Sequence, residues 1–206
     1  DTTIIEATSG NTGISLSYFA SLFGNKVIIV MPTSMSLERR RMISKFGAEL
    51  VLVEGGMKEC NEKAIELHKN LQNSIILGQF EHNSNKKAHY LYTSREIINE
   101  LPTVKYIVSG IGSGGTISGI GKYVKENNLD IKMIGVEPFE SPLLTKGISN
   151  THLIQGIGAN FVPKILELDV IDDIVLVKGE EALEAARQLN ELEDLLEVSK
   201  DETAIK

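Results

Sequence analysis

The sequence has 206 residues, of which 42% are hydrophobic and 24% are charged, an ordinary composition for a globular protein of one or two domains. Its formal net charge of −7 and its lack of a basic stripe argue against a nucleic-acid-binding protein. No apolar run reaches the roughly 18–20 residues of a membrane span. The single cysteine, Cys60, excludes an internal disulfide and fits a reducing compartment. From both observations we expect a cytoplasmic protein.

The first half of the sequence alternates short apolar runs, which predict buried strands, with amphipathic segments, which predict helices. Ile4-Ile5 opens a first strand, and the further predicted strands are residues 26–31, 49–53 and 74–80. The predicted helices are a segment that ends at Gly24, residues 36–47 and residues 57–71. The first of them is expected to bury the apolar stripe Ile14, Tyr18, Leu22 and Phe23. Ser36 can cap the second.

The second half repeats this alternation. Its predicted strands are residues 104–110, 131–137 and 173–177, and its predicted helices are residues 88–101, 117–124 and a last helix near residues 183–189. Alternation at this spacing predicts an α/β fold with parallel sheets and helices on both faces. Right-handed crossovers would place the strand-to-helix loops along one edge of a sheet, where ligands bind in such folds.

A polar segment, residues 81–87, is the predicted boundary between two lobes. We expect a small lobe at residues 1–82 and part of a larger lobe at residues 83–206. The irregular stretch of residues 138–163 is too long for a simple connection and predicts an active-site loop region.

A loop of small hydrogen-bonding residues follows the first strand. It consists of Thr8, Ser9, Gly10, Asn11, Thr12 and Gly13. The amides at the start of the next helix attract an anion, and the glycines let the backbone approach a ligand closely. The loop therefore predicts a site for a carboxylate or a phosphate. The alternative interpretation is a polar helix cap with no ligand.

A second glycine-rich loop, Ser109–Gly119, follows the strand at residues 104–110. It contains G-x-G-x-x-G at Gly110, Gly112 and Gly115, and Glu137 ends the next strand 22 residues after the last glycine. This spacing fits a dinucleotide-binding loop with an acidic residue for the ribose. The hydroxyls of Ser113 and Thr116 suit a terminal phosphate monoester equally well, so the pattern leaves both interpretations open.

Other polar residues give weaker signals. Gln79 ends a predicted strand at the same edge, where its side chain could contact a ligand or be structural. The histidines His82, His89 and His152 lack the spacing of a metal site, and we expect no metal.

Several motifs, taken together, resemble those of the cysteine synthases, O-acetylserine sulfhydrylases of the fold-type II pyridoxal-phosphate enzymes, with cystathionine β-synthase close by. The motifs are EATSGNTGIS (residues 6–15), MPTSMSLERRRMISKFGAELVLVEG (31–55), GSGGTISG (112–119), GVEP (135–138) and QGIGANFVP (155–163). They occur in the family's order over about residues 1–189. Five motifs at consistent spacing are far more specific than the glycine pattern alone.

The resemblance implies roles for the residues of both loops. The substrate carboxylate would be bound by Thr8, Ser9, Gly10 and Thr12, with help from Gln79. Asn11 would contact the phenolic oxygen of pyridoxal 5′-phosphate. The cofactor phosphate would be held by Gly112, Ser113, Gly114, Gly115 and Thr116. Gly156, with residues 157–158, would line the site near the substrate amine. Two anion-binding loops along one rim would then bind the two anionic ends of one adduct.

The activity that the resemblance implies is a β-replacement, in which O-acetylserine and sulfide give L-cysteine. The small lobe would close on the substrate and exclude water. The family also implies a homodimer and a partnership with serine acetyltransferase. A nucleic acid or membrane partner is not expected.

Two parts of the family pattern are missing. The Schiff-base lysine lies in a motif some tens of residues before EATSGNTG, and neither Lys26, Lys86 nor Lys87 sits in a matching motif. The serine that bonds the pyridine nitrogen lies in a glycine-rich turn, whereas Ser199 stands among charged residues. Because the sequence opens on Asp1, we expect a chain that is truncated at both ends, carries no catalytic residue of its own and is inactive in isolation.

Other functions stay open. Within the family, the alternatives are a cystathionine β-synthase and a cysteine desulfhydrase, because the residues that select the sulfur donor are not readable. Outside it, the glycine pattern permits an NAD(P)-dependent dehydrogenase. A catalytically dead module that binds a peptide carboxyl terminus is the non-enzymatic alternative.

Overall fold

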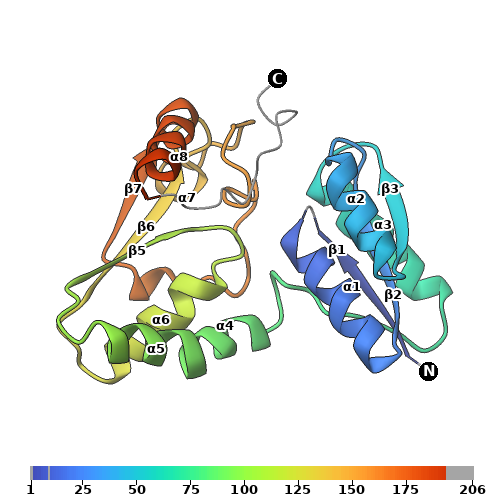
Figure 1. The fold of residues 1–206 in the computed structure, drawn as a ribbon, viewed down its shortest axis with the longest axis horizontal. Coiled ribbons are helices and arrows are strands. Elements are labelled where there is room, and N and C mark those ends of the chain that lie inside the picture. The colour runs from blue at the N-terminus through green and yellow to red at the C-terminus, as the bar shows by residue number, and fades with distance from the viewer. Residues whose placement is uncertain (1, 9, 194–206) are drawn as a thin grey trace. The chain divides into compact units, whose positions relative to one another are not determined.

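A computed structural model describes residues 2–8 and 10–193 and confirms the predicted α/β fold with parallel sheets (Figure 1). The chain divides into two compact units, the first running to Gly78 and the second beginning at Gln79. That division lies four residues before the boundary at 82/83 that the polar segment suggested. None of the described helices is both long and apolar enough to cross a membrane.

The first unit contains a four-stranded parallel sheet in the order β3-β2-β1-β4. Its strands are β1 (Thr3–Ala7), β2 (Lys26–Pro32), β3 (Glu49–Val53) and β4 (Ser74–Ile76). Its helices are α1 (Asn11–Phe23), α2 (Leu37–Lys45) and α3 (Met57–Asn70). The central strand β2 is buried along almost its whole length, which is why it reads as an uninterrupted apolar run.

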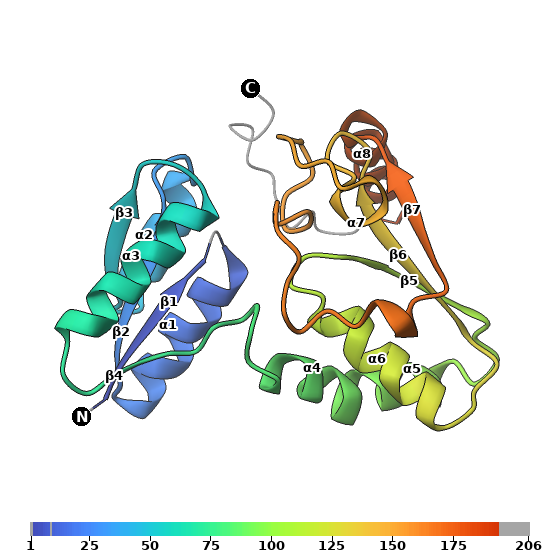
Figure 2. The same ribbon diagram turned by 180° about the vertical axis from the view of Figure 1, so that it is seen from behind.

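Helices cover both faces of this sheet. On one face Ile28 and Val30 of β2 pack with Cys60 and Ala64 of α3. On the other face the alternate residues of β2, including Ile29, pack with α1 and α2. Successive side chains of a strand point to opposite faces, so one short strand contributes to two cores. Figure 2 shows β1 and β2 lying between these helices.

The predicted apolar stripe of α1 is confirmed at Ile14, which packs against the core on this face, and is wrong at Tyr18, Leu22 and Phe23. The helix buries Gly13, Ser17 and Ala20, whereas Leu22 is 60% exposed and Phe23 is 77% exposed. The reason is the close approach of α1 to the sheet, since a Cβ atom at Gly13 would lie 3.2 Å from Cγ2 of Ile29. Only small side chains fit at the closest contact, whereas Ile14 and Leu16 pack against the same core while partly buried. Tyr18, 43% exposed, and Phe19 are likewise largely on the outside.

Strand β4 is also shorter than predicted, because it ends at Ile76 and leaves residues 77–80 outside the sheet. The amide of Gly78 donates a hydrogen bond of 2.7 Å to the buried Glu6 carboxylate instead of joining a strand ladder. Gln79 therefore lies in a turn and not at the end of a strand.

The second unit contains a three-stranded parallel sheet in the order β5-β6-β7. Its strands are β5 (Tyr106–Gly110), β6 (Lys132–Pro138) and β7 (Asp173–Val177). Its helices are α4 (Ser84–Ala88), the π-helical turn η1 (His89–Thr93), α5 (Ser94–Glu100), α6 (Gly115–Glu126), α7 (Leu143–Lys146), the 3-10 turn η2 (Leu168–Val170) and α8 (Gly179–Glu193). The core joins Ile107 and Met133 of the sheet to Ile117, Ile120 and Val124 of α6.

Segments α4, η1 and α5 form one continuous helical run alongside α6 (Figures 1 and 2). Residues 84–87, predicted to belong to the polar boundary, are thus helical. Sequence periodicity indicated the later part of this run, but the π-helical turn shifts the phase of the pattern and is not visible in it.

Candidate functional site

The first loop connects β1 to α1. Thr8 is only 2% exposed, and its hydroxyl accepts a hydrogen bond of 3.3 Å from the amide of Gly10. Gly10 is the N-cap of α1, so no side chain caps the helix there, and the first turn of α1 holds no acidic residue. The uncapped helix start is the positive end of the helix dipole and favours an anion.

The side chain of Arg39, from α2, lies beside this loop. Its Cζ and Nε atoms are 3.8 Å from the place where a Cβ atom on Gly10 would stand. This neighbour is not predictable from the sequence, because a residue in a charged helical segment gives no local sign of a contact with a distant loop. The guanidinium adds positive charge at the helix start. The predicted ligand residue Ser9 lies outside the described residues.

The second loop connects β5 to α6 and folds back on two other segments. A Cβ atom at Gly112 would lie 2.3 Å from the carbonyl oxygen of Gly156, so only glycine fits there. Gly114 has φ of +81°, a left-handed conformation that glycine adopts without strain. It is the N-cap of α6, whose first turn contains no acidic residue. The structure therefore forms a tight backbone cup at the start of α6.

This cup fits a phosphate monoester. Amides at a helix start attract an anion, and here the Gly115 amide makes only a long contact, 3.4 Å, with Oγ of Ser113. The hydroxyls of Ser113 and Thr116 stand at the same helix start. A phosphate group needs several donors converging on its oxygens, and both the backbone and the side chains of residues 112–116 can supply them. The donors of the cup and the positive end of the helix dipole thus suit a terminal phosphate group.

The structure brings the glycine-rich segment around Gly156 to this cup. The amide of Gly158 donates a hydrogen bond of 3.0 Å to the carbonyl of Ile111. Gly112 and Gly158, together with Phe161, line a small pocket beside it. The sequence separates these segments by about 40 residues, and only the fold makes Gly156 and Gly112 neighbours.

Glu137 does not have the role that a dinucleotide site requires. It is 2% exposed, and its carboxylate accepts hydrogen bonds of 2.9 Å from the amides of Leu144 and Thr145 and one of 2.5 Å from the Thr145 hydroxyl. Both oxygens thus bind the start of α7. The dehydrogenase interpretation therefore loses its acidic residue for the ribose.

Gln79 belongs to the second unit. Its backbone carbonyl accepts a hydrogen bond of 2.9 Å from Nδ2 of Asn85. The role of the Gln79 side chain, and the expectation that the two loops share one rim, stay predictions.

Two residues behind the cup are functional candidates that the sequence did not reveal. Nδ2 of Asn85 donates a hydrogen bond of 2.9 Å to the Ser113 hydroxyl, and Nε2 of His89 lies 3.2 Å from the Thr116 hydroxyl. The only sequence signal is their spacing of four residues, which places them on one helix face. Asn85 falls within the predicted polar boundary, and His89 lacks metal spacing. In the described part of the chain, no cluster of His, Cys, Asp and Glu could hold a metal ion.

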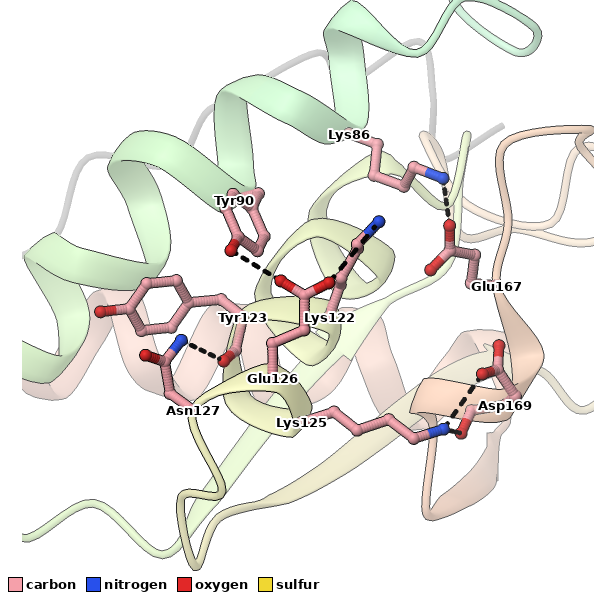
Figure 3. Close-up of polar contacts among 9 residues, drawn as sticks. All are labelled: Lys86, Tyr90, Lys122, Tyr123, Lys125, Glu126, Asn127, Glu167 and Asp169. Carbon is pink, nitrogen blue, oxygen red and sulfur yellow. Dashed lines mark hydrogen bonds and ion pairs between the residues drawn. The ribbon is translucent and has the colours of Figure 1, made fainter.

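Polar contacts around α6 fix this helix in the second unit (Figure 3). The Tyr90 hydroxyl donates to Glu126 at 2.7 Å, and Lys125 pairs with Asp169 at 3.1 Å. Lys86 forms an ion pair with Glu167. The Lys86 ammonium is therefore bound by a carboxylate, and the expectation that it is not the Schiff-base lysine stays a prediction.

Comparisons with known proteins identify relatives over nearly the whole chain. Residues 1–196 match the family described as pyridoxal-phosphate dependent enzyme. The chain is 51% identical to cysteine synthase B of Campylobacter jejuni over 192 residues, covering 92% of this chain and 64% of that protein. It is 38% identical to cysteine synthase A of Escherichia coli K12 over 205 residues, with coverages of 94% and 64%. The chain thus spans a little under two thirds of the length of these relatives.

Solved structures show the same likeness. A hydrogen sulfide-producing enzyme from Fusobacterium nucleatum is 42% identical, with a TM-score of 0.90 and coverages of 95% of this chain and 67% of that one. A cysteine synthase from Entamoeba histolytica is 38% identical, with a TM-score of 0.89 and coverages of 95% and 59%. These values confirm the predicted fold class.

Proposed function

Because this chain belongs to the family of pyridoxal-phosphate dependent enzymes, we propose that it is the cofactor- and substrate-binding part of a cysteine synthase, which makes L-cysteine from O-acetylserine and sulfide. The observation that carries the proposal is the backbone cup at the start of α6, with two hydroxyls and no acidic residue in the first helical turn. Similarity to several proteins named cysteine synthase supports the substrate class.

The cup binds the cofactor phosphate in this proposal. Amides of residues 112–116 and the hydroxyls of Ser113 and Thr116 donate to its oxygens. Bound in this way, pyridoxal 5′-phosphate supplies an electron sink for the carbanion that forms when the substrate loses its α-proton. Gly156, which lies against Gly112, lines the site near the substrate amine.

The loop between β1 and α1 binds the amino-acid substrate. Residues Thr8, Gly10 and Thr12, with Ser9, hold the substrate carboxylate at the positive end of α1, and Gln79 assists. Asn11 donates to the phenolic oxygen of the cofactor. Fixing the carboxylate sets the orientation of the substrate Cα–H bond, which lowers the entropic part of the barrier. Closure of the first unit on the substrate excludes water from the reaction.

The test of this proposal is product formation by the intact protein that contains this sequence, because no lysine of the 206 residues lies in a Schiff-base motif. With pyridoxal 5′-phosphate, O-acetylserine and sulfide, we expect L-cysteine, detected by mass spectrometry. Asn11→Ala should reduce the rate by at least about tenfold, the typical effect of one lost hydrogen bond to a charged group. Asn83→Ala is the matched control, because Asn83 is exposed. Saturable binding of NADPH, without binding of pyridoxal 5′-phosphate, would contradict the proposal.

A second candidate is a cysteine desulfhydrase, since one similar structure is described as a hydrogen sulfide-producing enzyme. Release of sulfide from L-cysteine in the same assay, in place of L-cysteine formation, would favour it. A cystathionine β-synthase would instead require homocysteine as the sulfur donor. If the protein forms no product but binds a peptide carboxyl terminus through the Asn11 loop, it is a binding module.

The partners follow from the same proposal. A homodimer and a complex with serine acetyltransferase are the arrangements that the resemblance implies, and the cytoplasm is the location expected from the composition. Sedimentation of the purified protein, alone and with serine acetyltransferase, distinguishes a monomer, a dimer and a mixed complex.

A further inference from the structure

The helical run of α4 and η1 lies directly behind the cup, on the side of α6. This helical run packs closely against α6. A Cβ atom placed on Gly119 would lie 2.4 Å from the carbonyl oxygen of Lys86 and 2.7 Å from Cβ of His89. A glycine in the middle of α6 thus allows the two backbones to approach. The close packing places side chains of α4 and η1 within hydrogen-bond distance of the two hydroxyls of the cup.

The orientation of the Asn85 amide follows from its neighbours. Its Nδ2 atom is 2.9 Å from the carbonyl oxygen of Gln79, and a carbonyl only accepts. The atom facing it must therefore be the NH₂ group, which also donates to Oγ of Ser113. The same Oγ accepts from the amide of Gly115 at 3.4 Å. Because Oγ of Ser113 accepts from both Asn85 and Gly115, the hydroxyl proton of Ser113 remains available to donate to a ligand.

His89 stands in the same relation to the second hydroxyl. Its Nδ1 atom is 3.1 Å from the Thr93 hydroxyl, and its Nε2 atom is 3.2 Å from the Thr116 hydroxyl. Burial lowers the pKa of His89, which favours the neutral ring. A neutral ring has one donor and one acceptor nitrogen. If Nδ1 accepts from Thr93, Nε2–H donates to Thr116 and leaves the Thr116 proton for a ligand.

We propose that Asn85 and His89 are positioning residues that donate to the oxygens of Ser113 and Thr116 and so direct both hydroxyl protons toward the phosphate of the cofactor. The inference rests on the proposed function and adds to it a fixed hydroxyl polarity and a fixed histidine tautomer. An anion accepts only, so a cup whose hydroxyls are already oriented as donors binds it without reorganisation. If the two hydroxyls donated to Asn85 and His89 instead, they could not donate to the phosphate oxygens.

The test compares variants that keep or remove the donors. The ligand is pyridoxine 5′-phosphate, which carries the phosphate but no aldehyde, and its affinity is measured by calorimetry. We expect His89→Leu and Asn85→Asp to weaken binding by about tenfold or more. His89→Leu removes the donor that fixes the Thr116 hydroxyl, and Asn85→Asp replaces a donor by an acceptor, which turns the Ser113 proton away from the phosphate. His89→Gln keeps an NH₂ donor near Nε2 and should stay within about threefold of the unmodified protein.

Two exposed neighbours provide matched controls. His82→Leu and Asn83→Asp make the same chemical changes on the same segment, and both should bind like the unmodified protein. Pyridoxine without phosphate should bind all variants equally, because it makes no contact with the cup. The inference is overturned if His89→Gln binds as weakly as His89→Leu, or if the Asn85 and His89 variants bind like the controls.

A measurement on the unmodified protein decides the case even if a variant fails to fold. In a ¹⁵N-labelled sample with bound ligand, the nitrogen shifts of His89 should show a protonated Nε2 and an unprotonated Nδ1, and the opposite tautomer would overturn the inference. If the unmodified protein binds no phosphorylated ligand at all, the proposed function fails as well. Normal binding with unchanged variants overturns the inference alone.

Discussion

Two buried carboxylates hold loops at the ends of strands in this chain. Glu6, in β1, accepts a hydrogen bond from the amide of Gly78, and Glu137, in β6, accepts from two amides at the start of α7. Both are 2% exposed. A buried carboxylate is tolerated only when donors replace its water. Glu6 therefore specifies the path of a loop far from it in sequence, and Glu137 specifies the path of the segment that follows its own strand. Their role is structural, although both stand next to the proposed ligand loops.

Cys60 gives a prediction for the dependence of stability on pH. Burial, and to a lesser extent the charge of Glu59, raises the pKa of its thiol from 9.0 to about 11. Below about pH 9 the thiol is protonated in both the folded and the unfolded chain. Between about pH 9 and 11 only the unfolded chain loses the proton, so the free energy of unfolding should fall by about 2–3 kcal/mol across this window.

Urea unfolding of the unmodified protein and of Cys60→Ala, at several pH values, measures this effect. The variant is less stable at every pH because it loses a buried group, but its curve should fall less steeply above pH 9. Parallel curves for the two proteins would show that the thiol does not contribute. A thiol reagent at pH 8 should also label Cys60 only after unfolding, because the side chain is fully buried.

At the scale of elements, helix α1 provides a direct test of which face is buried. Ala20 packs in the core against the sheet, whereas Leu22 is largely exposed. Ala20→Leu should therefore lower the free energy of unfolding by about 1–3 kcal/mol, because the tight space cannot hold three more carbons. Leu22→Ala should change it by less than about 0.5 kcal/mol. Denaturant unfolding of the two variants measures both changes in the free energy of unfolding. A larger loss for Leu22→Ala than for Ala20→Leu would instead support the predicted apolar stripe.

The same helix shows what the sequence can predict. Strands such as β3, predicted and observed at residues 49–53, are short apolar runs bounded by turn residues, so their signal is local. The buried face of α1 depends on how closely the helix approaches the sheet, which is a tertiary property. The end of β4 likewise depends on the distant carboxylate of Glu6. The periodicity of apolar residues does not indicate how closely a helix approaches a sheet, nor which distant side chain ends a strand.

The candidate site divides in the same way. Glycines and hydroxyls in the two loops are close together in sequence, so the pattern from Gly112 to Thr116 indicates a loop suited to a phosphate, although binding there stays a prediction and the pattern alone left a dinucleotide open as well. Asn85 and His89 act on the cup across a helix–helix contact, and the sequence contains no sign of that contact beyond their spacing. Residues proposed to bind a ligand directly are thus predictable from local sequence, whereas the residues that orient them are not.

At the scale of the whole molecule, the described residues form separate cores in the two units. In the first unit, Ile29 of β2 is fully buried against the helices that cover the sheet. In the second unit, Ile120 of α6 is 1% exposed and lies in the core. Replacing either by Ala leaves a cavity that costs about 2–5 kcal/mol. If each core stabilises mainly its own unit, the loss of protection against amide hydrogen exchange should be confined to the unit that carries the substitution.

Hydrogen exchange followed by mass spectrometry measures this for both variants on the same peptides. Ile29→Ala should increase exchange in β1, β2 and β3 and leave peptides of α6 unchanged, and Ile120→Ala should do the reverse. The cup belongs to the second unit, so only Ile120→Ala should also weaken binding of pyridoxine 5′-phosphate. Equal loss of protection in both units from either substitution would show that the two cores unfold as one cooperative structure, and phosphate binding would then depend on the packing of the whole chain.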